Sequence, residues 1–323
     1  MKSPCPCINK IVLSIAISCM LHACAHLPAD PNYPGPTALP KTITSQYIYA
    51  PYQGDCRVKV IEDRGSYVFK KITFPSANDT MMGEKIRLEY LDPKGDGKAP
   101  VIIILPVLKG AGNIIKDFAR FYAKHGYAAL IVNRKKRYLK DYDLTRVNDI
   151  LQEIVINHKQ VLDWIETQPD LDAERIGVFG ISLGGIKGAL ISQLDKRVRA
   201  SVIAMGGGDL PYVLAYSKEG SVEKKRNEYM KKNGLTVEEY HDILKQRITC
   251  DPMHFAPYMD ARNTMMILAL FDQCVPFTKG KELRDRMGKP ETIYLFSGHY
   301  TSLLFKAYVK HATLKFFNKK MGP

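Results

Sequence analysis

Ser182 is the residue whose surroundings most strongly indicate chemistry. It lies in the run Gly180-Ile181-Ser182-Leu183-Gly184-Gly185, between the apolar stretch Ile176–Phe179 and a segment, Leu183–Leu194, that can be helical. A serine between two glycines at a strand-to-helix turn is typical of an exposed nucleophile. Glycine is needed on both sides because a side chain there would collide with neighbouring backbone. A dinucleotide-binding turn is the alternative, but Ser182 replaces the middle glycine of Gly-x-Gly-x-x-Gly.

Two further residues could activate such a serine, and each follows a predicted strand. Asp272 comes directly after the apolar run Thr264–Phe271, and His299 follows the predicted strand Thr292–Phe296. His299 would act as the base that takes the serine proton, and Asp272 as the acid that holds the imidazole in the required tautomer. We therefore expect the three side chains to meet, in the chain order nucleophile, acid, histidine.

Other residues compete for these roles. Asp209 follows the predicted strand Ser201–Met205 and could supply the acid from the neighbouring strand end. We favour Asp272 over Asp209. The remaining histidines of the folded part are interpreted as structural or surface residues: His125, His158, His241, His254 and His311.

The elements around these residues alternate between strand and helix. The predicted strands also include Ile86–Tyr90, Val101–Leu105 and Tyr127–Val132, and the predicted helices Asn113–His125, Thr145–Thr167 and Thr301–Phe317. Near-continuous apolar strands alternating with amphipathic helices predict an α/β fold, with a mostly parallel sheet covered by helices on both faces.

A long insert separates the strands that end near Met205 and begin near Thr264. It contains two predicted helices, about 222–232 and 236–247, and Thr236 with Glu239 forms a capping-box pattern. We expect the insert to shape the substrate pocket through Tyr212, Tyr216, Tyr229 and Phe255; the alternative is that these aromatic residues form the insert's own core.

The chain resembles the α/β-hydrolase superfamily, in its dienelactone hydrolase-like and acetyl-esterase-like branch. The resemblance covers about residues 57–318 and is carried by residues 175–185, by Asp272 with Val275-Pro276, and by Gly298-His299. It implies the α/β-hydrolase fold with the insert, about 208–260, as a helical cap. It also implies an oxyanion hole of two backbone N–H groups, those of Leu183 and of Leu108, with Val107 as the alternative second donor. No metal or organic cofactor is expected.

The N-terminus predicts export. Lys2 and Lys10 precede an eleven-residue apolar run, Ile11–Leu21. This run is too short to span a bilayer and has the length expected for the core of a signal peptide. Leu21-His22-Ala23-Cys24 resembles the bacterial lipobox, so Cys24 is the predicted lipidation site. Ordinary cleavage after a small residue is the alternative and would give a secreted or periplasmic protein.

These observations divide the chain into three parts: a lipoprotein signal peptide, 1–23; a Pro-rich tether, 24–55; and the hydrolase domain, 56–323. The predicted location is the cell envelope, with the membrane as a partner through the N-terminal lipid. Cys56, Cys250 and Cys274 remain in the domain, where a Cys250–Cys274 disulfide and three reduced, buried cysteines are both open.

The formal net charge is +14, which falls to 14 − 2 = +12 without Lys2 and Lys10. No nucleic-acid module accompanies the basic runs Arg134–Arg137 and Lys224–Arg226, so we expect no nucleic-acid partner. The sequence favours a serine hydrolase acting on a small-molecule carboxylic ester. A prolyl-oligopeptidase-like peptidase and a non-catalytic binding lipoprotein are the alternatives, and the substrate and oligomeric state stay open.

Overall fold

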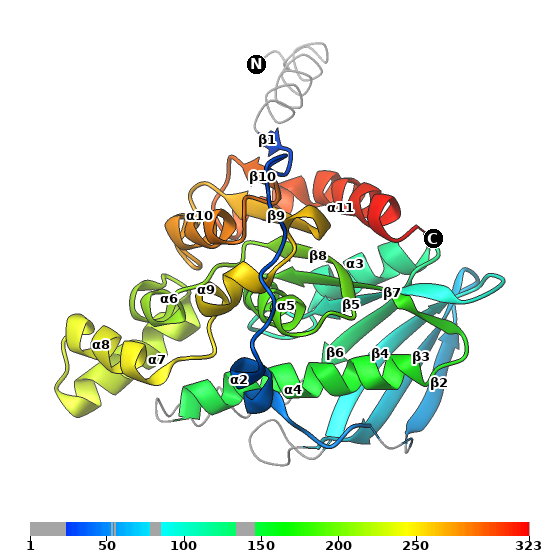
Figure 1. Cartoon of the computed structure of the whole chain (residues 1–323), viewed down its shortest axis with the longest axis horizontal. Helices are drawn as coiled ribbons and strands as arrows, with labels where there is room; N and C mark the ends of the chain where they lie inside the picture. Colours follow the sequence, from blue (N-terminus) through cyan, green and yellow to red (C-terminus); the bar gives the residue numbers. More distant parts are fainter. Residues whose placement is uncertain (1–23, 53, 55, 78–84, 134–145, 323) are drawn as a thin grey trace, which may run out of the picture.

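The computed structural model describes residues 24–52, 54, 56–77, 85–133 and 146–322 (Figure 1). The predicted signal peptide, 1–23, and the basic run Arg134–Arg137 lie outside these residues. In the described part of the chain, no helix combines the length and the apolar character needed to cross a membrane.

A ten-stranded sheet forms the centre of the described residues, in the order β1-β10-β9-β8-β7-β5-β6-β4-β3-β2. Its strands are β1 (Cys24–Leu27), β2 (Arg57–Asp63), β3 (Tyr67–Pro75), β4 (Lys85–Pro93), β5 (Ala99–Leu105), β6 (Ala128–Asn133), β7 (Leu171–Ile181), β8 (Val198–Ala204), β9 (Thr264–Ala269) and β10 (Glu291–Leu295). The six strands from β10 to β6 in this order are parallel, whereas β4, β3, β2 and β1 pair antiparallel with their neighbours. The mostly parallel sheet that the sequence predicts is confirmed.

Helices cover both faces of this sheet (Figure 1). They are α3 (Asn113–Ala123), α4 (Val147–Glu166), α5 (Leu183–Leu194), α6 (Leu210–Tyr216), α7 (Gly220–Asn233), α8 (Val237–Arg247), α10 (Phe277–Arg286) and α11 (Lys306–Lys320), with the short turns α2 (Lys41–Thr44), α9 (Pro252–Phe255), η1 (Ser45–Tyr47), η4 (Ala256–Tyr258), η5 (Ala261–Asn263) and η6 (Thr301–Phe305). Helices α3 and α11 pack on one face, and α4, α5 and α10 pack on the other.

Strand β5 explains why both faces need helices. Ile102 and Ile104 point into the core under α3 and α11, while Val101, Ile103 and Leu105 point into the core under α4. Side chains alternate across a strand, so a strand that is apolar at every position buries both faces. All five residues are fully buried. The carboxyl ends of the parallel strands therefore share one edge of a sheet that is closed above and below.

The prediction that the segment after Cys24 is a tether is wrong for the described residues. Strand β1 pairs with β10, Thr37 donates its N–H to the carbonyl of Pro257, and the Tyr33 hydroxyl donates to the carbonyl of Met259. Tyr47 is buried at 3% exposure. The prolines do favour an extended chain, but the tyrosines among them bind that chain to the domain surface. The described fold thus includes β1 and the segment that follows it.

The insert between β8 and β9 is helical, as its sequence pattern predicts. Thr236 caps α8 and forms the capping box with Glu239. Helix α8 packs on α6, and α6 packs on α7, so the three helices form a small layer beside the sheet (Figure 1). Helix α6 begins a few residues beyond the carboxyl end of β8, and Leu210 and Val213 of this helix line a cavity together with Ser182.

Candidate active site

Ser182 lies at a strained turn between β7 and α5. Its φ is 59° and its ψ is −123°, a left-handed backbone that a residue with a side chain rarely adopts. Its N–H donates to the carbonyl of Ala204 on β8, with a nitrogen–oxygen distance of 2.9 Å. A Cβ on Gly180 would collide with the Gly184 carbonyl, so the turn requires glycine where the sequence has it. This strain holds the Ser182 hydroxyl above the edge of the sheet.

The structure brings Ser182, His299 and Asp272 together. The distance from His299 Nε2 to Ser182 Oγ is 3.0 Å, and that from His299 Nδ1 to Asp272 Oδ2 is 2.7 Å. Asp272 follows β9 and His299 follows β10, so both residues leave the same edge of the sheet as Ser182. The three groups form one hydrogen-bond chain in the geometry required for a serine activated by an imidazole.

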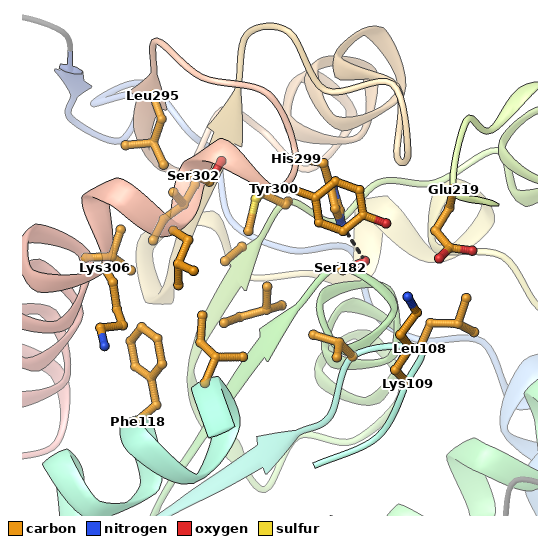
Figure 2. A pocket seen from close by; sticks show the side chains of 18 residues that line it. Leu108, Lys109, Phe118, Ser182, Glu219, Leu295, His299, Tyr300, Ser302 and Lys306 are labelled. Atoms are coloured by element: carbon orange, nitrogen blue, oxygen red, sulfur yellow. Dashed lines mark hydrogen bonds between the residues drawn. The ribbon is translucent and has the colours of Figure 1, made fainter. Parts of the chain in front are cut away.

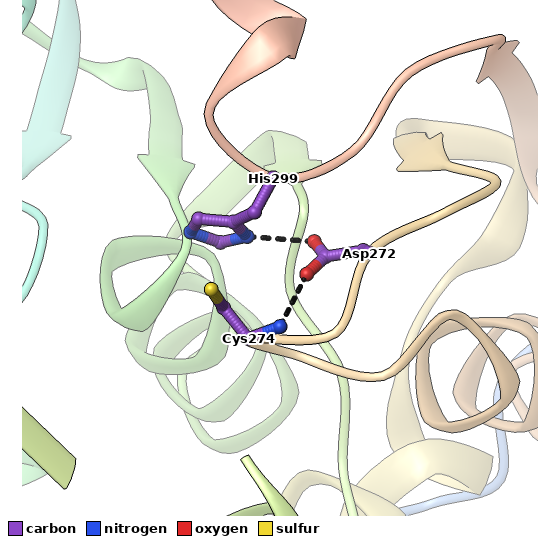
Figure 3. Close-up of side chains that lie close together, drawn as sticks. All are labelled: Asp272, Cys274 and His299. Carbon is purple, nitrogen blue, oxygen red and sulfur yellow. Dashed lines mark hydrogen bonds and ion pairs between the residues drawn. The ribbon is translucent and has the colours of Figure 1, made fainter. Parts of the chain in front are cut away.

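Backbone donors fix the carboxylate of Asp272. Its second oxygen, Oδ1, accepts the N–H of Cys274 at 2.8 Å and that of Val275 at 3.0 Å, and its side chain is 2% exposed (Figure 3). These bonds satisfy one oxygen and leave the other for His299. The carboxylate therefore orients the imidazole without needing to move.

Asp272, Cys274 and His299 also lie close enough to be considered as metal ligands. Burial, together with the nearby Asp272 charge, raises the pKa of the Cys274 thiol to about 11. A protonated thiol is a poor ligand, because metals bind the thiolate. The backbone donors to Asp272 and the bond from His299 to Ser182 account for this cluster as a hydrogen-bonded site.

The alternative acid, Asp209, forms its hydrogen bonds and its ion pair with residues other than His299. It caps α6 through the N–H of Tyr212, and its Oδ2 lies 2.6 Å from Lys279 Nζ. Its own N–H donates to Asp251. Asp209 is thus bonded into the base of the insert, while Asp272 holds His299.

Two apolar cavities meet at Ser182. One has a volume of about 280 Å³ and is lined by His299, by the η6 segment and by the start of α11 (Figure 2). The other has a volume of about 170 Å³ and lies between α4, α6 and α7. Leu108, Ser182 and Glu219 line both cavities. A substrate bonded at Ser182 therefore has separate room for two apolar groups.

The predicted oxyanion donors lie beside these cavities. Leu183 is the first residue of α5, so its N–H belongs to the helix N-terminus, where donors point outward. Leu108 lies in a tight turn closed by the bond from the Gly110 N–H to the Val107 carbonyl, at 2.8 Å. Leu108 lines both cavities, whereas Val107 lines the 280 Å³ cavity.

The insert lines the smaller cavity with aliphatic residues, and not with the predicted aromatic ones. Its lining residues there include Leu210, Val213, Leu214 and Val222. Tyr212 and Tyr216 pack on each other and on His241, Tyr229 packs on Tyr240, and Phe255 packs on Tyr47. The aromatic residues form the insert's own core and its contact with the N-terminal segment, which was the alternative.

Sequence reasoning missed Glu219, which caps α7 and lines both cavities. The sequence feature that could have revealed it is a carboxylate directly before a predicted helix, because a side chain there accepts hydrogen bonds from the first N–H groups of the helix. It also missed Ile150, Leu151 and Ile154 of α4, because their apolar stripe reads as ordinary core.

The cysteines in the described part of the chain are free thiols. Cys250 and Cys274 are both buried, but they form no disulfide, and Cys56 is exposed. The hydroxyl of Tyr47 donates to Cys250 Sγ at 3.3 Å. Burial raises the pKa of Cys250 to about 12. Of the two possibilities left open by the sequence, the reduced cysteines are the one observed, but the expectation that all three are buried is wrong for Cys56, which lies on the surface before the exposed edge strand β2.

A mostly parallel sheet with this serine turn, followed in the chain by the acid and the histidine, defines the α/β-hydrolase class. Residues 88–232 match the model of the dienelactone hydrolase family, and the chain has the α/β-hydrolase fold. The matched range includes Ser182. Asp272 and His299 lie beyond it, so their placement rests on the geometry described above.

Parts of this chain are similar in sequence to known proteins. An uncharacterized 31.7 kDa protein of the traX-finO intergenic region of Escherichia coli is 30% identical over 136 residues, which is 41% of this chain and 46% of that protein. A probable 2-oxo-3-(5-oxofuran-2-ylidene)propanoate lactonase of Bradyrhizobium sp is 29% identical over 124 residues, or 36% of this chain and 50% of that protein. The chain thus spans about half the length of the curated relatives it matches.

Among solved structures, acetyl xylan esterase 1 from Thermoanaerobacterium sp. JW/SL YS485 is similar over 87% of this chain and 99% of its own. The TM-score is 0.64 and the sequence identity is 18%. At that identity the likeness shows the fold.

Proposed function

We propose that this protein is a serine hydrolase that cleaves carboxylic esters through an acyl-enzyme on Ser182. The observation that carries the proposal is the hydrogen-bond chain from Ser182 Oγ through His299 to Asp272. The match of residues 88–232 to the dienelactone hydrolase family, and the esterase and lactonase named above, support an ester as the substrate class.

In the first step, Ser182 Oγ attacks the ester carbonyl carbon while its proton passes to His299 Nε2. Asp272 stabilises the imidazolium that forms. The electron pair of the carbonyl moves onto its oxygen, to which the N–H groups of Leu183 and Leu108 donate in this proposal; each such donor is worth about 2.7–4 kcal/mol of barrier. The carbon–alkoxy bond then breaks, and the proton on His299 leaves with the alcohol.

In the second step, water replaces the alcohol. His299 takes a proton from the water as its oxygen attacks the acyl carbon, and it returns that proton to Ser182 Oγ as the acyl bond breaks. The products are a carboxylic acid and the free enzyme. None of these steps calls for a metal or an organic cofactor.

The position of His299 assigns the two cavities. His299 must protonate the leaving alkoxide, so the alcohol group lies on its side of Ser182. That is the 280 Å³ cavity, which His299 lines. The acyl group then occupies the 170 Å³ cavity under α6 and α7. We infer a short acyl group joined to a larger apolar alcohol.

Labelling with a fluorophosphonate tests the nucleophile. Wild-type protein and the control Ser45→Ala, an exposed serine on η1 remote from the cavities, should both be labelled. Ser182→Ala should lose both the label and the hydrolysis of short acyl nitrophenyl esters, with an unchanged circular dichroism spectrum. Full ester turnover in folded Ser182→Ala would overturn the proposal.

The same reagents separate the alternatives. A binding lipoprotein would remain unlabelled even in the wild type, because it has no activated serine. A peptidase would be labelled but would cleave peptide amides in preference to nitrophenyl esters.

We also propose that Cys24 carries a lipid that anchors the protein in the cell envelope. The support is the run Leu21-His22-Ala23-Cys24 after an apolar segment. Cys24 is also the first residue of β1, so a chain cut before it keeps the folded unit whole. Cys24→Ala should abolish incorporation of a fatty-acid label and release the protein from membranes; retained label would contradict the assignment.

A further inference from the structure

Strand β1 fixes where the chain enters the folded domain. It runs antiparallel to β10, so Cys24 lies opposite Leu295, the last residue of β10. Leu295 lines the 280 Å³ cavity, and His299 follows four residues later. A group attached to Cys24 is therefore at the edge of the sheet that carries Ser182 and His299.

The same edge carries bulky apolar side chains that are more than half exposed. Phe271 is 55% exposed, Phe296 61%, Tyr300 64%, Leu303 56% and Leu304 68%. We call these five residues the apolar rim. Phe271 and Phe296 touch, with ring centroids 4.8 Å apart, and Tyr300 and Leu303 line the mouth of the 280 Å³ cavity.

The exposed aromatic side chains of the described residues gather at the apolar rim. Within residues 24–52, 54, 56–77, 85–133 and 146–322, the large aromatic side chains that are exposed are Phe271, Phe296, Tyr300 and Tyr308, all at this edge. Exposed apolar clusters of this kind mark interaction sites. Aromatic and leucine side chains suit the interface between lipid headgroups and acyl chains.

The chain itself indicates which partner covers the rim. Cys24 follows the apolar run Ile11–Leu21 and the lipobox-like residues, so the point of membrane attachment lies one strand away from Leu295.

We propose that the apolar rim docks on the bilayer that holds Cys24 and opens the 280 Å³ cavity toward it. The alcohol part of a membrane-dissolved ester then enters from the lipid phase. The substrate class rests on the proposed ester hydrolysis, and the docking rests on the proposed lipid at Cys24.

Tryptophan quenching tests the docking without any need for activity. Full-length Leu304→Trp and Val60→Trp are bound to vesicles of phosphatidylethanolamine and phosphatidylglycerol with brominated acyl chains. Val60 is 62% exposed on β2, at the opposite edge of the sheet and nine strand positions from β1, which is about 43 Å measured along the sheet at 4.8 Å per strand. The native Trp164 is 1% exposed and common to both variants.

The bilayer should quench the added emission of Leu304→Trp and leave Val60→Trp like the wild type. Equal emission loss in both variants, or none at Leu304→Trp, would overturn the docking. Failure to quench with a stable dimer in solution would show that a second copy covers the rim.

Kinetics test the access route. Phe296→Ser/Leu304→Ser changes two rim residues outside both cavity linings, and Val58→Ser/Val60→Ser is the control on β2. The rim variant should hydrolyse a water-soluble short ester normally and lose about tenfold or more on an ester dispersed in vesicles, as expected for lost apolar burial. Equal loss on both esters would overturn the access route. If no ester is cleaved by the wild type but quenching is seen, the proposed function fails and the docking stands.

Discussion

The carbonyl oxygen of Leu105 lies against Gly184, well within 3.0 Å of the position that a Cβ there would occupy. Real Cβ atoms do not come that close, and the obstacle is backbone, which cannot rotate away. The end of β5 and the start of α5 are therefore packed so tightly that only glycine fits.

Gly184→Ala should consequently lower the melting temperature or prevent soluble expression, because overpacking of a core typically costs about 1–3 kcal/mol or more. Gly95→Ala is the matched control, since a Cβ on Gly95 meets no atom within 4 Å. A Gly184→Ala variant with wild-type thermal stability would show that the turn is not packed as described.

Asp272→Asn should lower kcat by about 10⁴ with a folded protein, since an amide does not hold His299 in the productive tautomer. Asp209→Asn should change kcat little, because Asp209 is bonded to Lys279 and not to His299. Steady-state kinetics on a nitrophenyl ester measure both. If Asp209→Asn lowered kcat more than Asp272→Asn, Asp209 would be the acid of the site.

The cavity assignment predicts opposite selectivity changes from two substitutions. Leu214→Trp fills the cavity under the insert and should raise KM for longer acyl chains, while Leu303→Trp obstructs the other cavity and should raise KM for bulky alcohols. These KM changes can be measured with two ester series, one varied in the acyl group and one varied in the alcohol. An exchange of the two effects would reverse the assignment.

Thiol reactivity should follow burial. The pKa of Cys250 is raised to about 12 and that of Cys274 to about 11, so both remain thiols at pH 8. Iodoacetamide should modify exposed Cys56 in the native protein, and Cys250 and Cys274 only after unfolding. Mass spectrometry locates the adducts, and a peptide linked through Cys250 and Cys274 would contradict the free thiols.

Asp195 should make stability depend on pH. Burial alone would raise its pKa, but hydrogen bonds and charge from Arg197, with Lys159, hold the pKa below its usual value. A carboxylate with a lowered folded pKa stabilises the fold above its unfolded pKa of about 4, and that contribution is lost as the pH falls through the folded pKa.

Asp195→Asn should therefore lower the free energy of unfolding by about 2 kcal/mol at pH 7, since it removes one partner of a buried pair while Arg197 keeps Asp163 and Glu166. The difference from the wild type should shrink toward about pH 3. Urea denaturation at both pH values measures it, and a difference that does not change with pH would refute the linkage.

Local sequence patterns predicted the helices and strands that position the candidate site. The helix over Leu183–Leu194 and the strand that begins at Thr264 are found as predicted, because their apolar runs and glycine boundaries are local properties of the chain. The exposed edge strand β2 was not predicted. Its seven residues are all exposed, so burial imposes no alternation on them.

The N-terminal segment shows why composition misleads. Its prolines favour an extended spacer, but whether an extended chain is free depends on surfaces elsewhere in the sequence. The carbonyls of Pro257 and Met259 and the edge of β10 bind it. These contacts join residues more than 200 positions apart, and no local pattern encodes them.

The sequence by itself determined the residue types, the glycines of the Ser182 turn and the order of the three candidate catalytic residues, because these follow from short-range sterics and from the direction of parallel strands. Only the tertiary structure decided that Asp272 and not Asp209 meets His299, that two cavities join at Ser182, and that Cys24 lies at the catalytic edge. Those relationships depend on distances between segments remote in the chain, which packing alone fixes.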